Sequence, residues 1–325
     1  MKKRIHWLTD GNNVELDALL ESNLASTRLR TAVACQYLKS KGYCVSVGDF
    51  IVGEVDIVII GKIGFNPDKF EIWMKQIIDY KKNDVKIYLD YTDNHLGFNS
   101  PMRKYYQSFL TVSNKLIVTN KKMSEIVANY WNGTVSIIPD AIEVDIVPPK
   151  DVENIPLRLL WFGHASNVEF IINYIEKNSL INNDKVHLNI MTNPYGIELI
   201  VKYLEKYKSI ENVDILEWSK NLMCSVALKS DACIIPSSSI NPRKAGVSSN
   251  RLITALALGL PTVATNLESY KEYNKYYIDI DLYPIDFILK NLKFQKNLVK
   301  EAQNSIIKKY SNFDIGGLWH DAIEQ

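Results

Sequence analysis

Two carboxylates and an imidazole lie close together within residues 88–95. They belong to Asp90, Asp93 and His95, and they follow an apolar run, residues 85–89, that is typical of a buried strand. Groups at the carboxyl end of a parallel strand lie where ligands bind, and one of them can take a proton from an acceptor hydroxyl. We therefore predict catalytic work for Asp93 and His95, with Asp90 orienting the loop. A turn network that only shapes the loop is the alternative.

A second candidate site is a basic loop that precedes a predicted helix. The loop contains Arg243 and Lys244, and Gly259 and Pro261 mark the end of the helix. Free N–H groups and the helix dipole both favour a phosphate at a helix N-terminus. We expect the two basic residues to bind an anion together with the residues that open the helix, which are Ser248, Ser249, Asn250 and Arg251.

The loop at residues 163–167 is a third candidate, because it follows a predicted strand at 157–162 and precedes a helix. This is a common position for a phosphate or sugar contact. Its candidate ligand-binding residues are Gly163, His164, Ser166 and Asn167. A histidine that only caps the following helix is the alternative for His164.

The acceptor side is expected in the first half of the chain. Asp10, Gly11 and Asn12 follow the first predicted strand, and Arg28 opens the next helix. An arginine can hold a carboxylate or a phosphate through two parallel hydrogen bonds. An arginine on a helix surface, with no ligand, is the alternative for Arg28.

The elements that must position these residues alternate along the chain. Strand-like runs at 4–8, 55–60, 85–89, 115–118 and 135–138 are separated by amphipathic helices, and the pattern restarts at residue 157 after a proline-rich stretch, 139–156. Continuous apolar strands between helices indicate parallel sheets covered on both faces. We predict an α/β protein with two Rossmann-like domains, residues 1–145 and 157–300, that face a cleft. The helices of residues 301–325 are expected to return to the first domain.

The segment after the basic loop also carries a resemblance. Six residues, Ala255, Ala257, Gly259, Pro261, Val263 and Ala264, match the tail of the donor-binding motif of nucleotide-sugar glycosyltransferases with the GT-B fold. The chain is most similar to the family-4-like retaining enzymes. That motif has two glutamates eight positions apart, and the corresponding residues here are Gly246 and Thr254. The segment from Ser26 to Arg30 and residues 88–95 also resemble stretches of such transferases.

The resemblance implies a metal-independent glycosyltransferase that uses a nucleotide-diphosphate sugar and a glycan, glycoprotein or lipid-linked acceptor, as in bacterial polysaccharide assembly. It places Thr254 at the ribose and His164 where the family often has a diphosphate-binding arginine, so Lys244 or Arg243 would supply the charge. A non-catalytic nucleotide-sugar binding protein on a degenerate scaffold is the alternative. A nucleotide-sugar epimerase is a third reading.

Composition excludes some other classes. A net charge of +1 argues against a general nucleic-acid binder, and the sequence shows neither a signal peptide nor a run of about 20 apolar residues. Four cysteines without metal-ligand spacing are typical of reduced thiols, so we expect a cytoplasmic protein. A peripheral contact with the inner face of the membrane is an alternative that the sequence does not exclude. We expect no metal and no cofactor, and interpret Asp279 and Asp281 as lying beyond both sheets.

Overall fold

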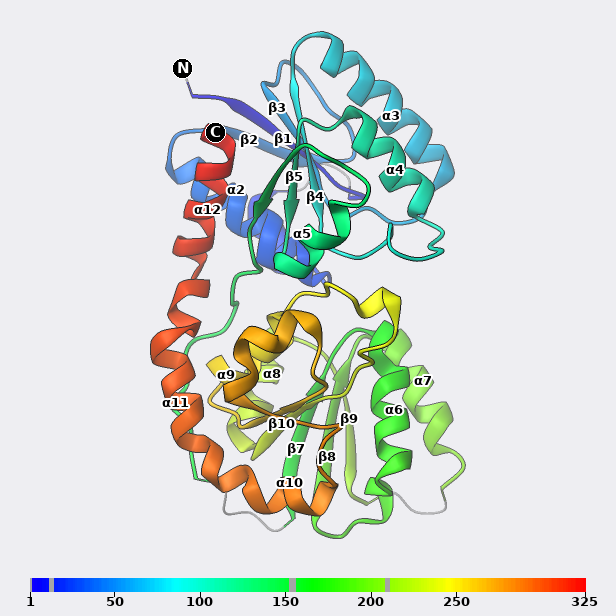
Figure 1. Ribbon diagram of the computed structural model, residues 1–325, viewed down its shortest axis with the longest axis vertical. Coiled ribbons are helices and arrows are strands. Elements are labelled where there is room, and N and C mark those ends of the chain that lie inside the picture. The colour runs from blue at the N-terminus through cyan, green and yellow to red at the C-terminus, as the bar shows by residue number, and fades with distance from the viewer. Residues whose placement is uncertain (1, 12–14, 152–155, 208–210) are drawn as a thin grey trace. The chain divides into compact units, whose positions relative to one another are not determined.

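The computed structural model describes residues 2–11, 15–151, 156–207 and 211–325 (Figure 1). The chain divides into two compact units. Unit 1 comprises Met1–Ala141, Asn241–Ser248 and Lys309–Gln325, and unit 2 comprises Ile142–Ile240 and Ser249–Lys308. Each unit is built on a parallel sheet with helices, which confirms the predicted α/β class.

Unit 1 contains a six-stranded sheet in the order β2-β1-β3-β4-β5-β6, and its paired strands are parallel. The strands are β1 (Arg4–Leu8), β2 (Cys44–Gly48), β3 (Ile57–Ile60), β4 (Lys86–Tyr91), β5 (Lys115–Val118) and β6 (Thr134–Ile137). The α-helices are α1 (Leu16–Leu20), α2 (Val33–Ser40), α3 (Pro67–Lys82), α4 (Arg103–Val112), α5 (Lys121–Val127) and α12 (Asn312–Glu324). The sequence pattern did not reveal β2, because this edge strand alternates exposed and buried residues and shows no continuous apolar run.

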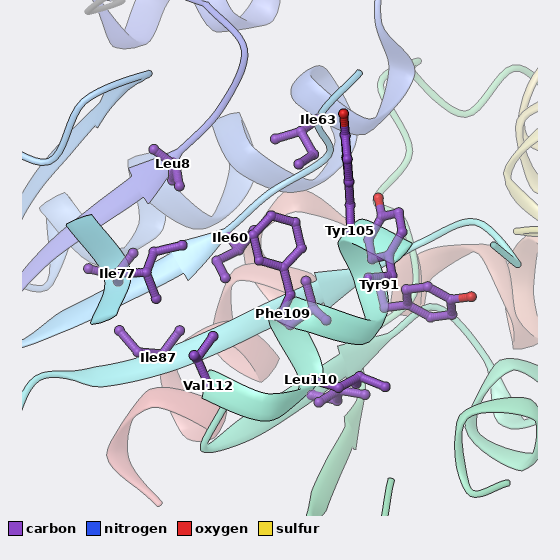
Figure 2. Packing of buried hydrophobic residues seen from close by; sticks show 14 of the residues in the cluster. Leu8, Ile60, Ile63, Ile77, Ile87, Tyr91, Tyr105, Phe109, Leu110 and Val112 are labelled. Carbon is purple, nitrogen blue, oxygen red and sulfur yellow. The ribbon is translucent and has the colours of Figure 1, made fainter. Parts of the chain in front are cut away.

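Two apolar clusters cover the opposite faces of this sheet. One joins α3 and α4 to the sheet, and Figure 2 shows Phe109 and Val112 of α4 beside Ile60 and Ile87. The other joins α2 and α12 to the sheet. Its centre is Trp319 of α12, whose ring lies 4.8 Å from the ring of Trp7 in β1. Burial of aromatic rings on both faces fixes the sheet and therefore the loops at its carboxyl edge.

A π-helix, η1 (Thr27–Ala32), replaces the first turns of the helix that we expected Arg28 to open. Its side chains from Arg28 to Ala32 are buried, and α2 continues from Val33. The side chain of Ser26, which precedes η1, makes no capping hydrogen bond. π-turns occur often at functional positions, and here the wider turn carries Arg30 into the interior.

Unit 2 repeats the architecture with the strand order β12-β11-β10-β7-β8-β9, again with parallel pairs. The strands are β7 (Leu157–Phe162), β8 (Val186–Thr192), β9 (Val213–Glu217), β10 (Ala232–Ile235), β11 (Thr262–Ala264) and β12 (Tyr277–Asp279). The α-helices are α6 (Val168–Lys177), α7 (Pro194–Leu204), α8 (Lys220–Lys229), α9 (Asn250–Ala257), α10 (Ile285–Asn291) and α11 (Lys296–Ser305). One apolar cluster joins this sheet to α6, α7 and α10.

Two positions of the predicted organisation need correction. Asp279 is the last residue of β12, an edge strand of the second sheet, so the Asp279–Asp281 segment does not lie beyond both sheets. The sequence had shown no strand there because β12 is aromatic-rich and ends in a charged residue, so it has no aliphatic run. The basic loop is the other correction, since Asn241–Ser248 groups with unit 1 and not with unit 2.

Candidate functional site

Asp90, the penultimate residue of β4, lies in a buried ion-pair network. Its carboxylate is 2.6 Å from Nη2 of Arg30, and both of its oxygens accept hydrogen bonds from the guanidinium. Arg30 also donates to Asp140 and to the carbonyl of Ile138. Because the side chain of Asp90 is only 3% exposed and is occupied by Arg30, it does not present a carboxylate to a ligand. Asp90 is thus a buried support beneath the loop that follows β4.

Asp93 and His95 lie in that loop and are accessible. The Asp93 carboxylate is 2.6 Å from Nζ of Lys62, with the aspartate side chain 37% exposed. The His95 Nδ1 is 2.7 Å from Oγ of Ser100, and its ring stacks on Tyr106 at 4.9 Å. The hydroxyl of Tyr91 accepts the backbone N–H groups of residues 95 and 96, which fixes the turn. The imidazole is therefore held on two sides.

The surroundings set the charges of both groups. Loss of hydration raises the pKa of Asp93, but the ion pair and hydrogen bond with Lys62 outweigh this, so the pKa is lowered overall. His95 and Lys244 act in the same direction as Lys62. Burial lowers the pKa of His95, and the positive charges of Lys62 and Arg243 lower it further. The negative charge of Asp93 acts in the opposite direction but does not outweigh them. Asp93 is therefore a stable anion, and His95 is a neutral imidazole at pH 7.

The basic loop is attached to unit 1 by two asparagine side chains. Asn94 donates to the carbonyl of Pro242 at 2.8 Å, and Asn120 donates to the carbonyl of Gly246 at 2.9 Å. Gly246 has φ +75°, and a Cβ there would lie 3.1 Å from Cε of Met123. A glutamate at this family position would meet both a strained backbone and the packing on α5. The geometry thus accounts for the glycine.

The predicted acceptor residues have local partners. The Asp10 carboxylate accepts the N–H of Gly64, and its carbonyl accepts Nζ of Lys69 at 3.1 Å. Gly11 is exposed beside it, and Asn12 lies outside the described residues. Arg28 is buried in η1 and donates to the carbonyl of Ser22. The surface-arginine alternative for Arg28 is therefore wrong, and the side chain holds the chain that leads into η1.

In unit 2, His164 caps the short 3-10 turn Ala165–Asn167. Its Nδ1 accepts the N–H of Ser166 at 3.2 Å, and the N–H of Ala165 is bound by Asn193 at 2.8 Å. This is the capping geometry that we considered for His164. The loop after β7 is consequently ordered by His164 within it and by Asn193, which precedes α7, and Ser166 and Asn167 form the turn that leads into α6.

The first turn of α9 faces this loop through Arg251. A Cβ added at Gly163 would lie 3.3 Å from Nη1 of Arg251 and 3.1 Å from Cζ2 of Trp161. Ser249 is the N-cap residue but its side chain makes no capping bond, whereas Ser248 and Asn250 have other partners. Thr254 is buried in the second turn. The predicted donor-binding residues of unit 2 therefore gather at the carboxyl edge of its sheet.

Unsatisfied hydrogen-bond donors occur at this edge. Within the described residues, ten buried side-chain atoms have no hydrogen-bond partner, and four of them belong to residues of unit 2 at or after strand ends or at the start of α9: Nε1 of Trp161, Oγ of Ser237, Nη1 of Arg251 and Oγ of Ser269. Buried polar groups in folded proteins are nearly always paired, and a buried group left unpaired costs about 1–3 kcal/mol. Each of the four can donate a hydrogen bond, which suits an anionic or hydroxyl-rich ligand.

Sequence reasoning missed several of these residues. Lys62 stands two residues after the end of β3, and its position near a strand end was a usable signal. Trp161, Ser237 and Ser269 gave no comparable signal, because their importance depends on partners that are missing in the folded chain.

Two further observations concern metals and membranes. No group of three or more histidine, cysteine, aspartate or glutamate side chains in the described part of the chain could hold a metal ion. Asp279 instead accepts the N–H of Asp281 at 3.0 Å in a local turn. Within the same residues, no helix combines the length and apolar character needed to cross a membrane.

Comparisons with solved structures identify the fold. A glycosyltransferase from Rickettsia africae ESF-5 matches with a TM-score of 0.66 and 13% identity, over 99% of this chain and 97% of that one. The lipopolysaccharide outer core galactosyltransferase WaaB matches with a TM-score of 0.60 and 12% identity, over 99% of both chains. The chain has the GT-B fold.

TarM is similar over a smaller part of its own length. Its TM-score is 0.61 at 16% identity, with 83% of this chain covered, and this chain spans only 55% of TarM. A structure of S. aureus TarM bound to UDP and other ligands also matches, with a TM-score of 0.58, 15% identity and the same shares of the two chains. No family model matches the sequence, and no curated protein matches it. At these identities the GT-B fold is what the similarity establishes.

Proposed function

We propose that this protein is a glycosyltransferase that moves a sugar from a nucleotide-diphosphate sugar to a glycan, glycoprotein or lipid-linked acceptor. The observation that carries the proposal is the set of unpaired donors at the carboxyl edge of the unit 2 sheet. In open α/β sheets this edge is where nucleotides bind. The bound UDP of TarM, which has the same fold, supports the choice of ligand.

Unit 2 would hold the donor. Arg251 and the N–H groups that open α6 and α9 suit its phosphates, and Thr254 suits a ribose hydroxyl. The bond between the sugar carbon and the phosphate oxygen breaks, and its electron pair leaves with the diphosphate. A preorganised positive environment stabilises that developing charge.

Unit 1 would hold the acceptor. His95 suits the role of general base because its imidazole is neutral, its Nδ1 is fixed by Ser100, and its Nε2 has no hydrogen-bond partner among the described residues. It would take the hydroxyl proton while the acceptor oxygen bonds to the sugar carbon. Asp93, paired with Lys62, is less suited to accept a proton and would instead favour the charged imidazolium that results.

A thermal-shift panel tests the donor site. UDP, GDP, dTDP, ADP and CMP are added separately, with and without EDTA. A ligand of the folded state present at about 100 times its Kd adds about 2.7 kcal/mol to stability. We expect one nucleotide to raise the Tm selectively and EDTA to leave the shift unchanged, because the proposed transfer is metal-independent. Absence of a shift with every nucleotide would count against the site.

A turnover assay then separates an enzyme from a binding protein. The protein is incubated with the sugar conjugate of the nucleotide that bound and with a mixture of glycan and lipid-linked acceptors, and free nucleotide diphosphate is measured. An enzyme releases the nucleotide together with a new glycosidic product. A binding protein on a degenerate scaffold consumes nothing, and an epimerase yields a changed sugar without needing an acceptor.

A further inference from the structure

Phe65 is an exposed aromatic residue in a loop whose other parts are held in place. It lies between β3 and α3, at the carboxyl edge of the unit 1 sheet, and it is 61% exposed. Ile63 of the same loop is buried in the apolar cluster shown in Figure 2. Gly64 donates its N–H to Asp10, and the Asn66 side chain caps α3. The loop therefore presents the Phe65 ring to solvent on a fixed backbone.

Two further rings support Phe65 from behind. Its ring stacks on that of Tyr105, with the ring centres 5.5 Å apart and the planes at 4°. Tyr105 stacks in turn on Phe70, at 4.0 Å and 6°. Because Tyr105 is only 8% exposed, Phe65 is the accessible member of this pair. A ring that is already held by its neighbours loses little freedom when a ligand covers it.

The helix that carries this tyrosine also supports the proposed base. Tyr106, the next residue in the first turn of α4, stacks on His95. Strands β3 and β4 are neighbours in the sheet, and the loops that follow them are joined by the ion pair between Lys62 and Asp93. Phe65 and His95 therefore border the same part of the sheet edge, within unit 1.

An exposed aromatic face with polar neighbours is suited to a sugar ring. The face of an aromatic ring is partially negative, and it attracts the C–H bonds on one side of a pyranose. The hydroxyls of such a sugar project from its rim, and Lys62 and Asp93, with side chains 39% and 37% exposed, are polar groups that can bind hydroxyls. A lipid chain needs a continuous apolar surface, whereas Phe65 stands between Gly64 and Asn66.

We propose that Phe65 binds the acceptor by stacking on a pyranose ring, so that the acceptor is recognised as a glycan and not through a lipid or a peptide. The inference rests on the proposed function, which leaves these acceptor classes open. Stacking fixes one face of the sugar and leaves its rim hydroxyls free to reach the base in unit 1. Phe65 thereby determines which class of acceptor is bound.

Saturation-transfer NMR tests this assignment with two kinds of probe. The first are the methyl glycosides of glucose, galactose, mannose and N-acetylglucosamine, and the second is octyl β-glucoside below its critical micelle concentration. We expect saturation on the ring C–H protons of both kinds. Phe65→Ala should weaken binding about 3–10-fold, and Phe65→Trp should stay within about threefold of the wild type. Saturation confined to the octyl chain, or absent from every sugar, overturns the inference.

Phe313→Ala is the matched control. Phe313 is a phenylalanine of the same unit, 69% exposed on α12, and its replacement should change sugar affinity by less than about twofold. In the turnover assay, Phe65→Ala should raise the acceptor KM about 3–10-fold and leave the KM of the nucleotide sugar within about twofold. Circular dichroism checks that each variant folds.

The outcomes separate this inference from the proposed function. A folded Phe65→Ala variant that binds sugars like the wild type overturns the inference, and so does one that changes only the KM of the nucleotide sugar. Neither result affects the proposed function, because that is tested by nucleotide binding and turnover of the wild type. A wild type without nucleotide binding or turnover overturns both.

Discussion

Replacing Arg30 with methionine removes the cation from the centre of the buried network in unit 1. The guanidinium makes three contacts to the oxygens of Asp90, between 2.6 and 3.1 Å, and donates to Asp140 at 3.1 Å. Its loss leaves two carboxyl groups that are 3% and 7% exposed without their cation. Breaking a buried ion pair on one side costs about 3–5 kcal/mol, a large part of the about 5–15 kcal/mol that stabilises a domain.

Urea unfolding measures this loss, and hydrogen exchange of the β4 and β5 amides assigns it to unit 1. The double variant Arg30→Met/Asp90→Leu should be more stable than Arg30→Met alone, because it removes one of the two uncompensated carboxyl groups. Lys82→Met is the control, since the Lys82–Asp79 pair is exposed and should contribute about 0.5 kcal/mol or less. A loss below about 1 kcal/mol in Arg30→Met would refute the reasoning.

The loss should also depend on pH. Burial raises the pKa of Asp90, and the charge of Arg30 opposes that rise. Without Arg30 the folded-state pKa moves further above the unfolded value, so the folded protein binds the extra proton first. The stability of Arg30→Met should therefore fall as the pH rises through that folded-state pKa and recover at lower pH. An Arg30→Met defect of constant size across the acid range would contradict an uncompensated carboxylate as its cause.

Three further perturbations address the fold and the site. Trp319→Ala should destabilise unit 1 by about 3–5 kcal/mol in urea unfolding, because the indole is fully buried against Trp7. Leu318→Ala, on the exposed face of the same helix, should cost about 0.5 kcal/mol or less. Similar losses in the two variants would contradict the packing. Asn120→Ala removes the N-cap of α5 and the hydrogen bond to the carbonyl of Gly246. Amide hydrogen exchange at residues 241–248 should therefore become about 5–10-fold faster. An unchanged exchange rate would show that other contacts hold the loop. Because burial lowers the pKa of His95, the unfolded chain binds more protons than the folded chain just below about pH 6.5. The free energy of unfolding of the wild type should therefore rise with pH in that window, and that of His95→Gln should rise less. Equal slopes in urea titrations at a series of pH values would exclude His95 as the source.

The strand framework could be predicted because it depends on local pattern. Ile57–Ile60 is a run of four buried aliphatic residues, and such runs between amphipathic helices indicate parallel strands without knowledge of their partners. The edge strands β2 and β12 escaped because short, partly exposed or aromatic-rich segments do not show that pattern. The hydrophobic pattern could not predict the order of the strands in each sheet, because packing between elements sets that order.

The candidate site was predictable in its location but not in its roles. Strand ends pointed correctly to the loops that carry Asp93, His95 and Gly163, because parallel topology gathers such loops at one edge. The ion pair that buries Asp90 could not be predicted, because its partner Arg30 is 60 residues away in the chain. The grouping of Arg243 and Lys244 with unit 1 depends on Asn94 and Asn120, whose side chains could have bonded to many other carbonyls.

The composition of unit 1 from three separate segments has a consequence for how the protein is made. Met1–Ala141 supplies the sheet and α2, but Lys309–Gln325 supplies α12, the other helix that covers the same face of it. Domains generally fold as units while the chain is synthesised, starting with the N-terminal one. Here the nascent first unit keeps part of that apolar face uncovered until residue 325 has left the ribosome, while unit 2 has all of its residues by Lys308. Unit 1 is thus the first to begin synthesis and the second to be complete. Until its last helix is synthesised, its nascent chain exposes apolar surface that chaperones can bind.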